Sequence, residues 1–363
     1  MSVTSVPSVF SIVILAVFMV LVVSCQDDAY DQKDIQPILT RLEIDRYTDV
    51  EAVSHQTVSW SEEWEQYFFD TEDCRCVLGN EFSVFVKPGT SNSLLLYLDG
   101  GGACWPPDYI DSCSTKVSSS GAELLHEVDL LPTWNRLFVP YCDGSVHMGD
   151  NDADYDGDGV VDHYHWGLKN VSGAIALMKQ LFPNPDEIVL GGSSGGGYGT
   201  LLAFAVLRSQ YPDVEVTIYN DAGPGMFNPY KPEVYETIKE TWQHMQFMPE
   251  ECPLCQDQIT YLYDFYLEYD PHVTIGMFSA YQDFVIATYF LRMSGPDFED
   301  ELLNITDYFH SRYPNRFKRY FVEGIYHTAF DYGLDNNVRN NISVVDWFYA
   351  MVEDSSEWTD VLE

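Results

Sequence analysis

A glycine-rich turn between an apolar strand and a helix constrains this chain most. Residues 188–197 read IVLGGSSGGG, in which Gly192, Ser194 and Gly196 fit the pattern G-x-S-x-G. In such a turn the central serine sits on a strained bend with its hydroxyl exposed, and the glycines avoid clashes with neighbouring backbone. The pattern predicts an α/β fold with Ser194 as a nucleophile. A tight turn without a catalytic role or a phosphate-binding loop would also contain such glycines, and both stay open as alternatives.

A second glycine signal lies upstream of the turn. Residues 93–105 read SLLLYLDGGGACW, an apolar strand that opens into three glycines. Serine elbows commonly stabilise the oxyanion of the tetrahedral intermediate with one N–H from the residue after the serine and another from a loop after an earlier strand. Here these groups would belong to Gly195 and to Gly101 or Gly102. Both signals occur in the chain order that an oxyanion hole requires.

The other members of a catalytic triad should follow the serine, acid first and histidine second. Asp283 comes after the strand that most often supplies the acid. We favour it over Asp221, which could simply cap backbone N–H groups in its turn. His327 follows the last apolar run and is the expected base, whereas His147, upstream of the serine, is a reserve candidate for substrate contact. The apolar runs concerned are residues 214–220, 273–279 and 319–325.

These residue types predict nucleophilic acyl transfer. His327 would take the proton of Ser194, and Asp283 would hold the imidazole in the right tautomer. An ester or amide substrate is implied, and no cofactor is needed for the chemistry.

The length of 363 residues suits one large α/β domain with insertions, after removal of an N-terminal signal. Residues 9–23 are apolar but too few to span a bilayer comfortably, so residues 1–25 read as a secretory signal. The ending LVVSC resembles a bacterial lipobox, in which Cys25 would carry a lipid, and an ordinary cleaved signal explains it equally well. We expect an exported protein whose only link to a membrane would be this lipid.

Residues 26–363 are expected to form a central, mostly parallel sheet flanked by helices. Residues 168–182 and 196–211 should be helices on either side of the elbow strand. Residues 231–269 are expected to be a helical insertion between two core strands.

Seven cysteines follow Cys25, and in an exported chain they favour disulfides over metal thiolates. A disulfide between Cys104 and Cys113 could close a short loop beside the three glycines. Cys252 and Cys255 are expected to form a structural disulfide. Because seven is odd, one thiol should stay free. The cysteines are residues 74, 76, 104, 113, 142, 252 and 255.

The net charge of −39, from 57 acids against 18 bases, argues against a nucleic-acid partner, because phosphates would be repelled.

An acidic loop at residues 150–165 contains the run DADYDGDGVVD. Such spacing can gather oxygen ligands around one hard cation, and Gly159 would allow the sharp turn. The loop lacks the bidentate glutamate of a calcium-binding helix-loop-helix motif, and a solvated acidic loop is the competing interpretation. We expect a structural calcium ion, with no part in the chemistry, held by Asp154, Asp156, Asp158 and Asp162.

Several segments together resemble the pectin acetylesterase and Notum carboxylesterase family. LDGGGACW is similar to the family's LEGGGWCW loop, residues 134–150 to its WNRVxxxYCDG segment, and GGSSGGG to its GxSAGG elbow. NDAGPG is similar to the DSG turn, SAYQD to the acid segment and IYHTAF to the histidine segment. Gly195 replaces the usual alanine, and Asp283 lies one residue later than the family's SAYD would place it.

The resemblance implies an α/β-hydrolase fold and a secreted carboxylic ester hydrolase. It makes deacetylation of an acetylated polysaccharide the first expectation for the substrate. Two alternatives stay open: a Notum-like deacylase of a lipid-modified protein, and a secreted binding protein without activity.

Overall fold

A computed structural model describes residues 1–2, 33–107, 112–334, 338–339 and 341–362. The expected signal segment at residues 9–23 and Cys25 lie outside the described residues. Residues 33–363 form one compact unit. Within the described part of the chain, no helix has the length and apolar character needed to cross a membrane.

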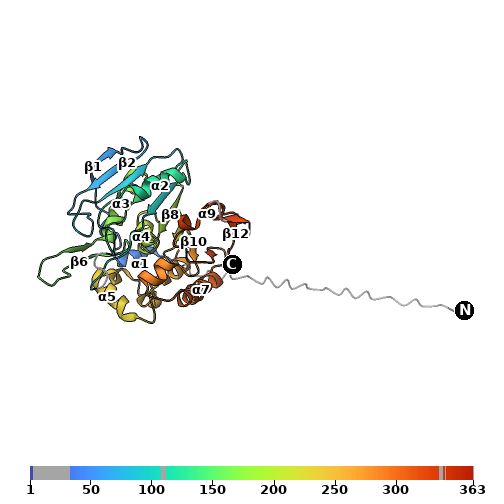
Figure 1. The fold of residues 1–363 in the computed structure, drawn as a ribbon. Coiled ribbons are helices and arrows are strands. Elements are labelled where there is room, and N and C mark those ends of the chain that lie inside the picture. The colour runs from blue at the N-terminus through green and yellow to red at the C-terminus, as the bar shows by residue number, and fades with distance from the viewer. Residues whose placement is uncertain (3–32, 108–111, 335–337, 340, 363) are drawn as a thin grey trace. The chain divides into compact units, whose positions relative to one another are not determined.

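A nine-stranded sheet forms the centre, in the order β1-β2-β3-β5-β4-β8-β9-β10-β11. From β5 to β11 neighbouring strands are parallel, whereas β1, β2 and β3 add an antiparallel end. In Figure 1 these blue strands lie at the opposite end of the sheet from the red C-terminal elements. The strands are β1 Ala52–Thr57, β2 Glu65–Phe69, β3 Ser83–Lys87, β4 Leu94–Leu98, β5 Asn135–Val139, β8 Glu187–Ser193, β9 Glu215–Asp221, β10 Val273–Ala280 and β11 Phe317–Val322.

Helices cover both faces of the sheet, as expected for buried parallel strands. Two small two-stranded sheets, β6 with β7 and β12 with β13, lie outside the main one. The helices are α1 Gln36–Arg41, α2 Ser120–Val128, α3 Gly167–Leu181, α4 Gly195–Gln210, α5 Pro232–Trp242, α6 Leu262–Tyr269, α7 Gly295–Arg312, α8 Ala329–Tyr332 and α9 Val344–Val352, with short helical turns η1 His244–Phe247, η2 Pro253–Gln256, η3 Ile259–Tyr261 and η4 Val285–Phe290; the small strands are β6 Asn151–Ala153, β7 His163–His165, β12 Val338–Arg339 and β13 Ile342–Ser343.

The expected architecture is confirmed, with differences at its edges. The helices predicted at 168–182 and 196–211 are α3 and α4, and the segment 231–269 is helical. The last apolar run ends sooner than expected, because β11 stops at Val322 and residues 323–325 pass into the turn before His327.

The two faces of the sheet are packed differently. Alternate side chains of β4, β8 and β9 point toward α3 and α4 and form a large apolar core with them, represented by Leu96, Leu190 and Ile218. The other alternate set, which includes Val189 and Tyr219, faces α2 and α9. Side chains of these two helices and of the strands between them line a cavity on this face.

The described residues contain three disulfides. Cys104–Cys113 and Cys252–Cys255 confirm the two expected pairs, and Cys76–Cys142 is a third that the spacing did not suggest. Of the seven cysteines after residue 25, Cys74 is free, and it is buried. Disulfides are consistent with a location outside the reducing cytoplasm.

Candidate active site

Ser194 occupies the turn between β8 and α4 with φ 55° and ψ −118°, a conformation that residues with side chains rarely adopt. The positions around it must be glycine, because neighbouring backbone atoms leave no room for a side chain. A Cβ atom on Gly192 would lie 2.3 Å from the carbonyl oxygen of Gly196, and one on Gly196 would lie 2.0 Å from that of Leu98. The G-x-S-x-G segment therefore folds as the strained elbow that its sequence predicts.

Ser194, His327 and Asp283 form a continuous hydrogen-bonded chain. The Oγ of Ser194 lies 2.8 Å from Nε2 of His327, and Nδ1 of His327 lies 3.0 Å from Oδ2 of Asp283. The amides of Val285 and Ile286 both donate to Oδ1 of Asp283 at 2.9 Å, which fixes the carboxylate. In the tautomer with the proton on Nδ1, the free Nε2 can accept the serine proton.

Burial raises the pKa of the Asp283 carboxyl, and its hydrogen bond to His327 opposes that rise. The carboxylate is fully buried, whereas the imidazole keeps 19% of its surface exposed. An acid that stays ionised here gains from a protonated His327, because the opposite charge offsets its lost hydration. This arrangement can stabilise an imidazolium that forms during a reaction.

Asp221, the alternative acid, lies nearby but makes different contacts. Its carboxylate accepts hydrogen bonds from Oγ of Ser193 and from the amide of Ala329, both at 2.9 Å, and the hydroxyl of Tyr97 bonds to Ser193 in turn. Burial raises the pKa of Asp221 to about 6. The structure thus brings Asp283, rather than Asp221, against the imidazole of His327, and uses Asp221 to join the elbow to the histidine loop.

The three predicted oxyanion-hole glycines lie around the nucleophile. A Cβ atom on Gly195 would lie 3.4 Å from the carbonyl oxygen of Gly102, and Gly101 and Gly102 line a cavity together with Ser194. In the part of the chain that the structure describes, the amides of Gly101, Gly102 and Gly195 donate to no protein acceptor. Unpaired amides next to a nucleophile are suited to bind a developing oxyanion.

His147 does not reach the surface where a substrate would bind. Its side chain is 1% exposed, its Nε2 lies 2.9 Å from the carbonyl oxygen of Asp99, and burial lowers its pKa. The expectation of a substrate contact is therefore wrong, because Asp99 and the glycine loop lie over the imidazole. Its place is behind the loop that carries the oxyanion-hole glycines.

The acidic loop brings together three of its four candidate ligands. Carboxylate oxygens of Asp154, Asp156 and Asp162 lie within 4.8 Å of one another. Asp158 is not part of this group. Three carboxylates fit a hard cation such as calcium, which prefers oxygen ligands. This loop is separate from the triad residues.

Two cavities border Ser194 among the described residues. The large cavity, about 420 Å³, lies against the sheet face between α2 and α9 and also borders His327; its lining includes Leu95, Tyr97, Leu124, Val189, Tyr219 and Phe348. The small cavity, about 250 Å³, lies on the side of η4 and borders Gly102 and Gly195; its lining includes Trp105, Val146, Tyr198, Ile286, Tyr289 and Phe290. Both volumes are close to or within the range of small-molecule sites.

Comparison with known proteins finds similarity to pectin acetylesterases in part of the chain. A family model described as Pectinacetylesterase matches residues 129–256, which include Ser194 but neither Asp283 nor His327. Pectin acetylesterase 4 of Arabidopsis thaliana is 30% identical over 151 residues, or 37% of this chain and 36% of that protein. The chain thus matches only about a third of the length of this curated relative.

The structure of the Wnt deacylase Notum from Drosophila superimposes with a TM-score of 0.57 at 17% identity, covering 86% of this chain and 96% of that one. The resemblance to the pectin acetylesterase and Notum family is confirmed. At this level of identity the Notum structure bears on the fold alone, and the expected α/β-hydrolase-like fold is confirmed with it.

Proposed function

We propose that this protein is an extracytoplasmic carboxylic ester hydrolase that uses Ser194 as its nucleophile. The hydrogen-bonded chain from Ser194 through His327 to Asp283 is the observation that carries the proposal. The similarity to pectin acetylesterases and the fold shared with Notum support the same reaction class. An inactive binding protein would have no need of a strained elbow aligned with a base and an acid.

The reaction follows from the contacts. Ser194 Oγ attacks the ester carbonyl carbon while Nε2 of His327 takes its proton, and Asp283 stabilises the imidazolium. The amide of Gly195, with that of Gly101 or Gly102, binds the oxyanion. When the tetrahedral intermediate collapses, His327 returns the proton to the leaving alkoxide. Water then hydrolyses the acyl-serine with His327 as base.

An acetylated polysaccharide is the substrate that the family resemblance favours. The small cavity favours a second candidate, because its apolar walls enclose more space than the methyl group of an acetate can fill. A deacylase for longer acyl groups, including one that acts on a lipid-modified protein, would use that space. The two candidates differ in the acyl length that the enzyme prefers.

Hydrolysis of p-nitrophenyl esters from acetate to palmitate tests both the mechanism and the acyl length. We expect Ser194→Ala to lower kcat on the order of 10⁶-fold, because losing the nucleophile removes the covalent route. Ser311→Ala, on the exposed surface of α7, is the matched control and should behave as wild type.

Labelling of the wild type by a fluorophosphonate, followed by mass spectrometry, should place the adduct on Ser194. Ester hydrolysis that persists in Ser194→Ala would disprove the mechanism. The absence of any esterase activity in the folded wild type would favour the binding protein instead.

A further inference from the structure

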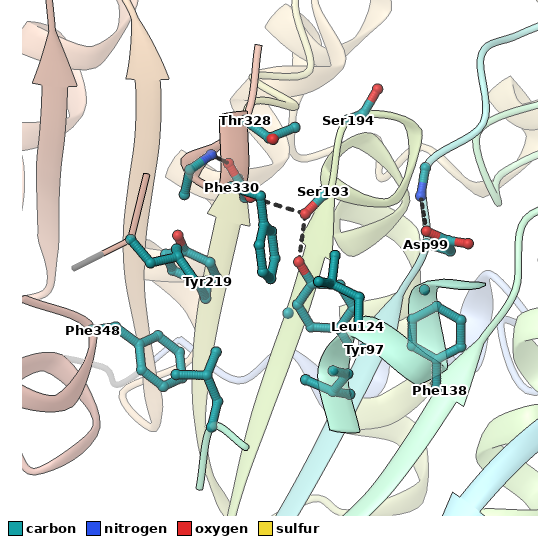
Figure 2. Close-up of a pocket in the computed structure, with 18 of the residues that line it drawn as sticks. Tyr97, Asp99, Leu124, Phe138, Ser193, Ser194, Tyr219, Thr328, Phe330 and Phe348 are labelled. Atoms are coloured by element: carbon teal, nitrogen blue, oxygen red, sulfur yellow. Dashed lines mark hydrogen bonds between the residues drawn. The ribbon is translucent and has the colours of Figure 1, made fainter. Parts of the chain in front are cut away.

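The loop of Gly100, Gly101 and Gly102 carries amide donors that bind an oxyanion only if they keep their direction. On one side the loop is held by the backbone, because the carbonyl oxygen of Gly101 accepts the amide of Ser114 at 2.7 Å. The loop begins at Asp99, whose side chain accepts the amide of Gly100 at 3.0 Å, as Figure 2 shows. A contact that holds Asp99 therefore helps to hold the loop.

The carbonyl oxygen of Asp99 is bound by a buried imidazole. Nε2 of His147 lies 2.9 Å from this oxygen, and the side chain of His147 is 1% exposed. Burial lowers the pKa of His147, so the ring is neutral near pH 7. A carbonyl oxygen can only accept a hydrogen bond. The single ring proton therefore belongs on Nε2, and His147 donates it to Asp99.

The other ring nitrogen indicates that packing alone does not explain this histidine. Among the described residues, Nδ1 of His147 has no hydrogen-bond partner, and Oδ2 of Asp143 lies 3.7 Å away, too far for a hydrogen bond. A buried nitrogen without a partner costs free energy, so an apolar side chain would fill the same space at lower cost. The hydrogen bond to Asp99 is the contact that an apolar side chain could not replace.

The surroundings give the imidazole a defined position. Helix α4 leaves room for it at Gly199, where a Cβ atom would lie 2.8 Å from the Cβ of His147. The ring of Tyr141 packs edge to face against the imidazole, with 5.1 Å between the ring centroids. The carbonyl oxygen of Asp99 also approaches the elbow, since a Cβ atom on Gly196 would lie 2.7 Å from it. His147 thus fixes Asp99 where the glycine loop meets the elbow.

We propose that His147 is a positioning residue for the oxyanion hole. Its Nε2–H holds the carbonyl oxygen of Asp99, and this bond keeps the amides of the glycine loop directed at the oxygen that becomes negative in the tetrahedral intermediate. His147 touches neither the substrate nor the reacting atoms. The inference rests on the proposed ester hydrolysis and adds a residue outside the triad.

Three substitutions separate the hydrogen bond from the space that the ring fills. His147→Leu removes the donor, whereas His147→Gln carries an amide Nε2 that can donate to Asp99. His147→Asn is polar but too short to reach, and asparagine tolerates the left-handed backbone here, where φ is 62°. With p-nitrophenyl acetate we expect kcat to fall about 30-fold in the Leu and Asn variants, with KM within twofold of the wild type, because the oxyanion forms only after binding. His147→Gln should keep at least a third of the wild-type kcat.

The matched control is His244→Leu. His244 is also fully buried, burial lowers its pKa, and its Nδ1 likewise lacks a partner among the described residues, but it borders neither cavity. This substitution should lower Tm as His147→Leu does and leave kcat unchanged.

An inhibitor that mimics the intermediate tests the oxyanion hole directly. Trifluoroacetophenone accepts the Oγ of Ser194 at its carbonyl carbon, the serine proton passes to His327, and the ketone oxygen becomes an oxyanion in the hole. Its Ki should rise at least tenfold in His147→Leu and stay at the wild-type value in His147→Gln and His244→Leu.

Three kinetic results would overturn the inference. The first is wild-type kcat and Ki in folded His147→Leu or His147→Asn. The second is a His147→Gln variant as slow as His147→Leu, since the donor would then not matter. The third is a higher KM at constant kcat, which would indicate a loss of uniform substrate binding instead.

A magnetic resonance measurement tests the hydrogen bond without the reaction. Protein with ¹⁵N-labelled histidine should show a slowly exchanging proton on Nε2 of His147, and this signal should be absent from His147→Leu. A proton on Nδ1 in an active wild type would contradict this inference alone. A folded wild type that hydrolyses no ester would contradict the proposed function, whichever nitrogen carries the proton.

Discussion

Two groups of aspartates in this chain have opposite electrostatic surroundings. Around Ser194, burial raises the pKa of Asp99 and Asp221 to about 6 and also raises that of Asp283. In the exposed acidic loop, hydrogen bonds from the amides of Gly159 and Gly157 lower the pKa of Asp154. An aspartate buried near Ser194 is thus costly to ionise, whereas Asp154 in the exposed loop is easy to ionise.

The comparison shows that position, rather than the count of acids, decides what a carboxylate can do in so acidic a chain. A buried carboxylate is held by particular donors and can act on a neighbouring imidazole. An exposed carboxylate is hydrated, and it contributes little to the stability of the fold unless several carboxylates bind the same cation. Replacing aspartate by asparagine in both regions tests this difference directly.

The largest effect is expected for Asp283→Asn. Asparagine keeps the size of the side chain but removes the charge that stabilises the imidazolium, and it favours the wrong tautomer of His327. We expect kcat to fall about 10⁴-fold with p-nitrophenyl acetate. Asp257→Asn, at an exposed position, should leave kcat unchanged. A loss smaller than tenfold would remove Asp283 from the mechanism and weaken the contrast between the two groups.

Asp221→Asn is expected to change stability rather than chemistry. The folded-state pKa of about 6 lies above the ordinary value of 3.8, so the folded protein holds this proton more tightly than the unfolded chain does. Stability from this group is fully present below about pH 4 and is lost as pH rises through about 6. Since one pKa unit corresponds to about 1.4 kcal/mol, the loss is about 3 kcal/mol.

Urea unfolding at pH 5 and at pH 8 measures this contribution. The wild type should lose more unfolding free energy between the two pH values than Asp221→Asn does, by about 1.4 kcal/mol, because this group is already ionised in the unfolded chain at pH 5 and about half of the loss has occurred by then. Asp257→Asn should follow the wild type. An equal pH dependence of Asp221→Asn and wild type would show that ionised Asp221 is not costly in the folded protein.

The candidate catalytic residues were largely predictable, because strand ends and chain order locate them. Ser194 follows an apolar strand and His327 follows the last one, so the parallel sheet brings both to the same edge. The choice between Asp283 and Asp221 could not be made with certainty from sequence, because each follows a strand. Only the course of the backbone after β10, with the amides of Val285 and Ile286 closing on Asp283, distinguishes them.

Features that depend on packing between distant segments were not predictable. The large cavity depends on how far apart α2 and α9 lie over the sheet, which no local pattern encodes. The hydrogen bonds that join Tyr97, Ser193 and Asp221 were missed for the same reason, although the second serine of GGSSGGG stands next to the nucleophile. The burial of His147 likewise depends on the fold of the glycine loop around Asp99.

The smallest effect is expected in the acidic loop, and it tests whether its carboxylates converge on a cation. If Asp154, Asp156 and Asp162 hold calcium with a Kd of about 0.1 to 1 mM, 10 mM calcium should stabilise the fold by roughly 1 to 3 kcal/mol and raise Tm by a few degrees. Asp162→Asn should abolish this rise, whereas Asp158→Asn should keep it, because Asp158 lies outside the cluster. A chelator should leave kcat unchanged, since the loop contributes no residue to the triad. The same Tm with calcium and with chelator would identify a solvated acidic loop, and the exposed group of aspartates would then have no role beyond charge.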